Sequence, residues 1–503
     1  MKKIFWMLCS MTVLFAAGCE SDKTEDEGPV GEARITSFVF SAEKNADVLL
    51  KDYTGTITDS KISVQVPAGT DVSSLIATFE VEQEGTVVTV NGTEQVSGTT
   101  ANDFSVAVDY LVTFGKKNAL YTVTVGELPE ATWQKVSETE LATNEFRMAI
   151  DPTDNQPGFA IQVRSAEDAQ GPILYAKLDG STLTPETAYA GNSNYIAFGY
   201  NKSGQPYIFF QDYVETSSER AGGIVTYTGG KWNRENVTTQ KPNAYVGHAI
   251  CDVDGKMFVF SSNDKAGTNV PRREINMTTL SGGAWTTDQA IPNRPLNRGY
   301  WPIAYEKDNT LYLMVSNPVS PMSVSFYKYA NNTWSTILEA YSYPSASGDG
   351  TFQDFPIKGI GPNIVADDEG NIYAAVSYMY SPQVLKINAA TQEVSLVGSA
   401  IAPVGSIAGR YCRVAISPLG KLYLVYKKAD DAAQLQVVSL DDTTKDWGAP
   451  VQISTDEAED FDIKFAPDGT AYLAYTVSND IDMSAGTVIT PGKLVLYKLA
   501  TAE

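Results

Sequence analysis

Residues 303–338 read IAYEKDNTLYLMVSNPVSPMSVSFYKYANNTWSTIL. Three apolar stretches are separated first by the turn pair Asp308-Asn309 and then by a variable loop. A second turn, Asn331-Asn332, leads into a stretch that begins around Trp334. Short apolar runs bounded by Asn, Asp and Gly turn signals are typical of β-strands joined by hairpins. This segment therefore predicts four consecutive strands.

Nearly the same pattern occurs seven times between residues 145 and 503. An aromatic residue marks the second strand of each repeat, and successive markers are 48, 51, 54, 61, 50 and 49 residues apart. A period of about 40–50 residues with four short strands per unit is typical of a β-propeller. We predict seven blades, with six or eight as alternatives. The markers are Phe159, Tyr207, Phe258, Tyr312, Tyr373, Tyr423 and Tyr472.

Tryptophans predict how the ring closes. In four repeats a tryptophan opens the fourth strand, but the seventh repeat has no such strand after Leu494–Lys498. The segment Thr132–Val136, which contains Trp133 and precedes the first repeat, has the missing form. We predict that it supplies the outer strand of the last blade, which leaves no unpaired edge between the two ends. The four tryptophans are Trp232, Trp285, Trp334 and Trp447.

The N-terminus resembles the export signal of a bacterial lipoprotein. Residues 1–18 combine Lys2 and Lys3 with an apolar stretch, 4–15, that is too short to span a bilayer. Ala16-Ala17-Gly18-Cys19 resembles the lipobox, although Ala16 stands where Leu is commonest. The resemblance implies that Cys19 is lipidated and becomes the mature N-terminus; an ordinary secretory signal is the alternative.

Residues 19–32 form an acidic tether, and their acidic run resembles the surface-export signal of bacteroidete lipoproteins. A segment of this composition cannot pack a core. The resemblance implies a protein that is lipid-anchored in the outer membrane, through Cys19, and faces the cell exterior.

Residues 33–126 predict an all-β module. Alternating apolar residues mark five strands, and Pro67-Ala68-Gly69 and Asn91-Gly92 mark turns. About ninety residues with short strands fit an immunoglobulin-like (Ig-like) β-sandwich. The module resembles the cadherin-like sandwich of bacteroidete surface lipoproteins, notably at 66–72 and 121–125, which implies a spacer; ligand binding is the alternative. The predicted strands are 35–40, 62–66, 77–81, 105–108 and 121–125.

The complete chain is therefore expected to be all-β: signal peptide 1–18, tether 19–32, Ig-like sandwich 33–126, linker 127–131 and seven-bladed propeller 132–503. The net charge is −23, and removing Lys2 and Lys3 with the signal makes it −25. This charge opposes binding to nucleic acid and to anionic membrane surfaces.

The composition also limits the chemistry. His248 is the only histidine, so a His-rich zinc site is impossible, and Cys251 and Cys412 alone cannot form a cysteine zinc site. These two cysteines fall in the third and sixth repeats, so we expect inert core thiols and no disulfide. No phosphate-binding loop, dinucleotide fingerprint or calcium-loop spacing is present. We expect no metal, no cofactor and no catalytic residue.

Loop lengths indicate the working face of the propeller. The first and third turns of each repeat share one face and are short, whereas the second loops and the crossings between blades are long and varied. Binding residues concentrate on long loops of a rigid scaffold. Aromatic rings beside planar donors and carboxylates suit sugars, although such residues also pack between blades. The candidate ligand-binding residues are Arg147, Tyr195, Tyr245, His248, Arg298, Tyr300, Trp301, Arg410, Tyr411, Arg413, Asp460 and Asp462.

The sequence favours capture of a glycan, as the resemblance to surface lipoproteins of polysaccharide-utilisation systems implies. One alternative is a lyase or glycoside hydrolase on the same face, with His248 beside Tyr245 or Tyr411 as base. A second is a protein-interaction platform in an outer-membrane complex.

Overall fold

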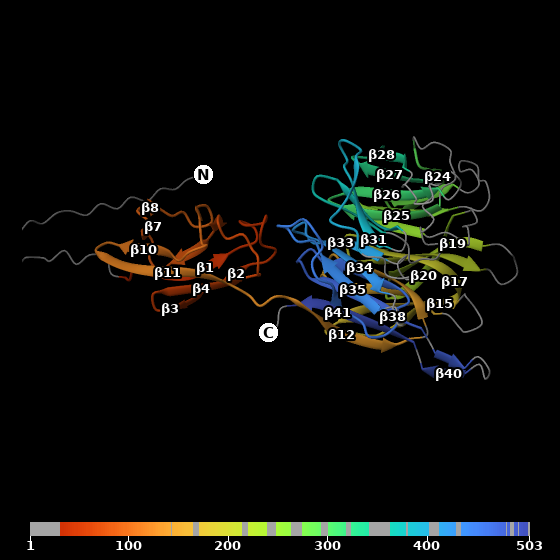
Figure 1. Ribbon diagram of the computed structural model, residues 1–503, viewed down its shortest axis with the longest axis horizontal. Helices are drawn as coiled ribbons and strands as arrows, with labels where there is room; N and C mark the ends of the chain where they lie inside the picture. Colours follow the sequence, from red (N-terminus) through yellow and green to blue (C-terminus); the bar gives the residue numbers. More distant parts are fainter. Residues whose placement is uncertain are drawn as a thin grey trace, which may run out of the picture. The chain divides into compact units, whose positions relative to one another are not determined.

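The computed structural model describes residues 31–141, 143–163, 171–213, 220–238, 248–262, 274–292, 300–317, 323–341, 363–378, 381–401, 412–428, 434–478, 480–482, 487–490 and 492–500. All regular elements in this part of the chain are β-strands. Within the same residues, no helix has the length and hydropathy to cross a membrane. The chain divides into two compact units between Leu128 and Pro129, and Figure 1 traces both from red to blue.

The first unit is a β-sandwich. Its core brings together side chains from two main sheets, and the rings of Phe38, Phe40 and Tyr110 meet edge to face at 5.5 Å. Strands β4 and β11 pair in parallel, whereas the other pairs are antiparallel. The sheets are β2(Tyr53–Thr54)-β1(Ile35–Phe40)-β6(Thr78–Val81), then β3(Thr56–Thr58)-β4(Lys61–Val66)-β11(Lys117–Glu127)-β10(Val108–Phe114)-β7(Val87–Val90)-β8(Thr93–Glu94), and the small pair β5(Leu75–Ile76)-β9(Ala101–Asn102).

One strand predicted in this unit is wrong. Residues 105–108 were expected to be extended, but the strand runs from Val108 to Phe114. The Asp103 carboxylate accepts the Ser105 amide at 2.9 Å and forms a local turn instead. The observed strand alternates more regularly between buried and exposed residues than residues 105–108 do. Val108, Tyr110 and Val112 are buried, and the residues between them are exposed.

The second unit is a β-propeller, as predicted. Its described residues form seven four-stranded antiparallel blades, and the innermost strands contact one another consecutively around a closed ring. The blades are numbered along the chain, and the strands of each are given from inner to outer. Blade 1 is β13(Thr143–Ile150), β14(Pro157–Val163), β15(Gly171–Asp179) and the start of β17(Glu186–Tyr200); blade 2 is the end of β17, β18(Pro206–Tyr213), β19(Arg220–Thr228) and β20(Lys231–Thr238); blade 3 is β21(His248–Val253), β22(Lys256–Ser262), β23(Ile275–Ser281) and β24(Ala284–Ala290); blade 4 is β25(Tyr300–Lys307), β26(Thr310–Asn317), β27(Ser323–Ala330) and β28(Thr333–Tyr341). Blade 5 is β29(Ile364–Ala366), β30(Ile372–Tyr378), β31(Ser381–Ile387) and β32(Val394–Leu396); blade 6 is β33(Cys412–Ile416), β34(Leu422–Lys428), β35(Gln434–Ser439) and β36(Val451–Gln452); blade 7 is β37(Phe461–Phe465), β38(Ala471–Val477), β41(Lys493–Ala500) and β12(Thr132–Glu140).

Each aromatic marker lies on the second strand of its blade, as expected. Two short elements lie outside the four-strand pattern: β16(Thr182–Leu183) pairs with β15, and β39(Asp480–Asp482) pairs with β40(Thr487–Thr490).

The predicted closure is confirmed. Strand β12 pairs antiparallel with β41 over eight register pairs, from Thr132–Ala500 to Glu140–Lys493, and the two strands lie side by side in Figure 1. Trp133 packs against a core shared by the last two blades, and Val136 packs against a core shared by the last and the first. The strand that precedes the first blade therefore completes the seventh.

Several turns of the short-turn face are two-residue hairpins, whereas others, such as 151–156 and 388–393, are longer. Asp308-Asn309 and Asn331-Asn332 both have positive φ, between 49° and 60°, at all four residues. This conformation matches the twist of two-residue hairpins and is one that Asn and Asp tolerate. These turns therefore connect strands without adding surface.

The outer tryptophans also fasten neighbouring blades, which the sequence did not indicate. Each indole faces the preceding blade, where it donates a hydrogen bond or packs edge to face on phenylalanine rings. Trp447 differs from expectation because it lies in an isolated bridge just before β36. The contacts are Trp232 to Glu186 (2.8 Å), Trp285 to Glu235 (2.9 Å), Trp447 to the Val397 carbonyl (3.1 Å), and Trp334 to Phe258 and Phe260 (ring centroids 6.2 and 6.0 Å).

Candidate functional site

Five of the twelve predicted ligand-binding residues have described side chains. Tyr245, Arg298, Arg410 and Tyr411, together with Cys19, lie outside the described residues. For His248, Tyr300 and Trp301 the structure gives the strand position alone: His248 begins β21, and Tyr300 and Trp301 begin β25. The described five are Arg147, Tyr195, Arg413, Asp460 and Asp462.

Three of these five meet where blades 6, 7 and 1 come together. Asp460 immediately precedes the innermost strand of blade 7, and its Oδ2 lies 3.3 Å from Nη1 of Arg147 in blade 1. Its Oδ1 lies 3.9 Å from Nη2 of Arg413 in blade 6. The same carboxylate accepts the backbone amides of Phe146 (3.3 Å) and Phe461 (2.9 Å). A single carboxylate therefore joins three consecutive blades.

Burial raises the pKa of Asp460 to about 6, and the two arginines only partly oppose this effect. The side chain is 2% exposed, so desolvation of the charged form outweighs the attraction of Arg147 and Arg413. Arg413 is itself 7% exposed and lies 5.7 Å from the Phe461 ring centre. Asp460 and Arg413 thus lie inside the junction and are too deeply buried to touch a ligand in this conformation.

Arg147 is the accessible member of this junction. Its side chain is 23% exposed, and its guanidinium also donates to the Glu145 carboxylate at 2.9 Å and to the Phe146 carbonyl at 2.6 Å. Two carboxylates, one at each terminal nitrogen, therefore fix the orientation of the guanidinium. An arginine has five N–H donors, and the described residues provide three acceptors for Arg147: the Glu145 and Asp460 carboxylates and the Phe146 carbonyl.

The other two described candidates do not join the junction. Tyr195, at the crossing into the innermost part of β17, is half-buried and has φ of 51°, beside an irregularity in strand pairing between Asn194 and Ala197. Positive φ is uncommon for a bulky residue and marks local strain. Asp462 lies further along β37, where its carboxylate accepts the Ile463 amide (2.9 Å) and lies 3.5 Å from the Lys464 amine.

Two further polar side chains link neighbouring blades through partners that the sequence did not indicate. Lys427 is 5% exposed, donates to the Glu459 carbonyl at 2.8 Å and has a pKa lowered by desolvation. The Asn363 side-chain amide donates to the Val414 carbonyl (2.6 Å) and accepts the Val414 amide (2.7 Å), which links blade 5 to blade 6. Nothing in the local sequence signals these partners, because they lie 32 and 51 residues away.

Among the described residues, no group of three or more His, Cys, Asp or Glu side chains is arranged to hold a metal ion. Cys251 and Cys412 are free and buried. Burial raises the pKa of both thiols, that of Cys412 to about 12, which suppresses thiolate chemistry.

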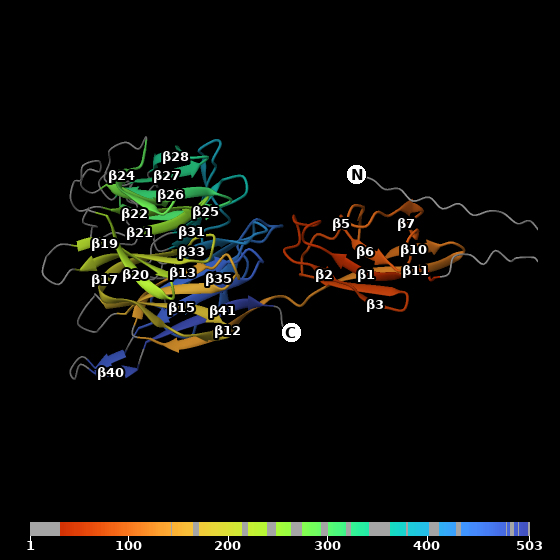
Figure 2. The ribbon, with the colours of Figure 1, turned by 180° about the vertical axis from the view of Figure 1, so that it is seen from behind.

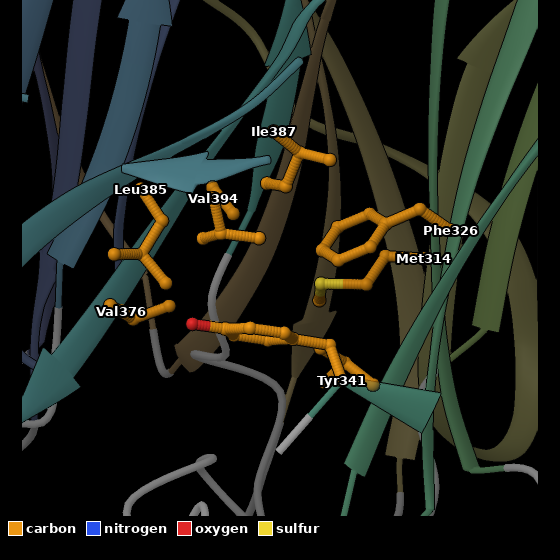
Figure 3. A pocket seen from close by; sticks show the side chains of 9 residues that line it. Met314, Phe326, Tyr341, Val376, Leu385, Ile387 and Val394 are labelled. Atoms are coloured by element: carbon orange, nitrogen blue, oxygen red, sulfur yellow. The ribbon is translucent and has the colours of Figure 1, made fainter. Parts of the chain in front are cut away.

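An apolar cavity between blades 4 and 5 is not a credible glycan site. Met314, Phe326, Tyr341, Leu385 and Val394 are among the side chains that converge on it (Figure 3). The volume within it that the centre of a water molecule can occupy is only about 10 Å³. This is the minimum needed to hold one water molecule. The cavity is therefore a packing gap.

Comparison with known proteins gives one sequence match. Residues 35–125 match the family model described as "SGBP, N-terminal", whereas no curated protein matches the chain. Solved structures with similar folds include a Dyadobacter fermentans DSM 18053 protein of unknown function, with 11% identity over 74% of this chain and 99% of that chain and a TM-score of 0.43. A DUF4623 family protein from Bacteroides eggerthii DSM 20697 has 11% identity over 93% of this chain and 99% of that chain, with a TM-score of 0.34. Another is the six-bladed lectin of Aleuria aurantia, with 13% identity over 65% of this chain and 96% of that chain and a TM-score of 0.39.

Proposed function

We propose that this protein is an outer-membrane lipoprotein that captures a glycan on the long-loop face of its propeller, at the cell exterior. The match of residues 35–125 to the SGBP N-terminal family carries the proposal, because SGBP proteins are surface glycan-binding proteins of Bacteroidetes. The lipobox-like residues Ala16–Cys19 and the acidic run after them support anchoring through lipid at Cys19. In this proposal residues 33–126 act as a spacer and residues 132–503 bind the ligand.

The geometry of Arg147 supports recognition of sugar hydroxyls. A planar donor group whose orientation is fixed before binding loses little conformational freedom when it meets a ligand. The carboxylates of Glu145 and Asp460 provide that orientation, and the 23% exposure of Arg147 leaves it accessible. We assign Arg147 to ligand contact and Arg413 and Asp460 to positioning.

A polysaccharide panel tests the function. Soluble protein comprising residues 20–503 is incubated with starch, xylan, pectin and mixed-linkage β-glucan, and both retention and release of products are measured. The proposal expects retention on at least one polymer without product release. Product release would instead support the lyase or hydrolase alternative. If no polymer is retained, the result contradicts capture of these four classes of polysaccharide.

A matched pair of variants tests the face. Arg147→Lys keeps the charge that balances Glu145 and Asp460 but loses the planar fork, so affinity for the retained polymer should fall about tenfold. Asn331→Gly alters a tight turn on the opposite face, where its φ of 50° suits glycine, and should bind normally. Equal affinity of the two variants would remove Arg147 from the site.

A further inference from the structure

An aromatic cluster with one exposed ring lies on the outer part of blade 2, at the short-turn end of its strands and away from the proposed site on the long-loop face. Tyr227 is 40% exposed, and no other described Phe, Tyr or Trp is as exposed. It occupies the end of β19 that leads into the short turn Gly229-Gly230. Strands β19 and β20, which carry the cluster, lie side by side (Figure 2).

Tyr227 contacts one further ring, which in turn contacts a ring of the preceding blade. It pairs across the strands with Trp232, with ring centroids 5.4 Å apart and planes at 67°. Trp232 meets Tyr175 of blade 1 at 5.1 Å, and its indole nitrogen donates to Glu186. These contacts fix the rings, so a ligand that meets Tyr227 finds an ordered surface.

The equivalent pair in blade 4 shows that the exposure is not required by the fold. Tyr329 pairs with Trp334 in the same register, with ring centroids also 5.4 Å apart, but these residues are only 6% and 8% exposed. The Lys256 amine lies 5.5 Å from the Tyr329 ring centre and Phe258 lies 4.8 Å from it. The propeller therefore buries this pair in one blade and presents it in another.

The polar surroundings of Tyr227 favour a sugar over a protein partner. The Gln205 side-chain amide donates to Thr228 Oγ1 at 2.9 Å, and the Asn233 amide donates to the Thr228 carbonyl at 3.0 Å. Amides, a hydroxyl and glycines around one exposed ring match the apolar face and hydroxyl rim of a pyranose. Protein-binding hot spots instead lie in broader desolvated apolar surroundings.

We propose that Tyr227 is the centre of a second glycan-contact site, which stacks against a pyranose ring of a long polysaccharide chain. This inference rests on the proposed function, because a second contact adds affinity for a polymer that the ring site already holds. Linking two contacts through one chain raises the overall affinity through effective concentration. A short fragment that fills only the ring site gains nothing from Tyr227.

The test uses the protein of residues 20–503, the panel named above and the six-sugar fragment of each polymer, with affinity measured by native gel retardation and calorimetry. Tyr227→Ala should weaken polymer binding about tenfold or more and leave fragment binding unchanged. Tyr227→Phe, which keeps the ring, should bind as the parent does. Leu396→Ala removes a side chain of similar exposure (44%) from the outer strand of blade 5 and is the matched control.

Failure of the inference and failure of the proposed function give different results. If the parent protein binds a polymer and Tyr227→Ala binds it equally well, the second site is refuted while glycan capture stands. If Leu396→Ala loses as much affinity as Tyr227→Ala, the effect is not specific to the aromatic ring and the inference also fails. If the parent protein binds no polymer, the proposed function itself fails, and the inference fails with it.

Discussion

Removing the closing strand β12 should weaken the propeller measurably. We compare a protein that begins at residue 129 with one that begins at residue 142, so that both lack the sandwich and only the second lacks β12. The second protein leaves β41 as an unpaired edge, because β12 covers it over eight register pairs. Unpaired edges expose backbone donors and acceptors and promote association.

The magnitude follows from what β12 buries. Eight ladder pairs provide roughly eight backbone hydrogen bonds at about 1 kcal/mol net each. The cost of ordering nine residues, taken at the low end of about 1 kcal/mol each, cancels this contribution. A fully buried Trp is worth about 3–5 kcal/mol, so partly buried Trp133 contributes about half of that. Val136 and Leu141, also partly buried, add roughly 2 kcal/mol at about 0.8 kcal/mol per CH₂. The net loss is therefore about 4 kcal/mol.

Calorimetry converts this loss into a temperature. An unfolding entropy of about 2.1 cal/mol/K per residue, summed over a unit of residues 129–503, predicts a fall in Tm of about 5 °C. A synthetic peptide of residues 130–142, added in excess, should restore part of the fall by mass action. Equal melting temperatures of the two proteins, with no effect of the peptide, would refute closure by β12.

The remaining predictions concern the anchor, the junction and the aromatic ring residues. Cys19→Ser should move the protein out of the membrane fraction, and fatty acid still incorporated into that variant would contradict lipidation. The pKa of Asp460 is raised to about 6 from an ordinary 3.8, so its ionisation costs stability as pH rises from about 4 to 6, by about 3 kcal/mol in total. The free energy of unfolding of Asp460→Asn, measured with urea at each pH, should lack this pH-dependent loss, even though Arg147 and Arg413 lose their counter-charge. If stability falls equally with pH in the parent protein and the variant, Asp460 does not titrate in this range. Trp301→Ala with Tyr411→Ala should lower glycan affinity about thirtyfold without lowering Tm, and normal binding by the folded double variant would exclude these aromatics as the platform.

The blade pattern was predictable because its signals are local. The turn pairs, the aromatic on each second strand and the tryptophan that marks the fourth strand in four repeats all lie within one repeat of about fifty residues. Closure by the Trp133 segment followed from the same local form. The boundary between blades 1 and 2 was less visible, because β17 runs without a break from Glu186 to Tyr200 and serves both blades.

The candidate site was only partly predictable, for a physical reason. Asp460 accepts the amide of Phe146, which is 314 residues away, and reaches Arg413 of a third blade. An aspartate that faces a ligand and one that clips blades together have the same local sequence. Their burial separates them, and burial depends on the packing of the whole ring.

Strand β12 also has a mechanical consequence. Only residues 128–131 connect the end of β11 to β12, so any tension that enters from the N-terminal side reaches the propeller first at the strand that holds the ring shut. Under the proposed function, flow that pulls on a captured polymer would load that ladder, and rupture of the ladder would open the ring. If the protein is tethered at its N-terminus, the propeller stays closed around a ligand only while the force along the chain is below the force that breaks the β12–β41 ladder.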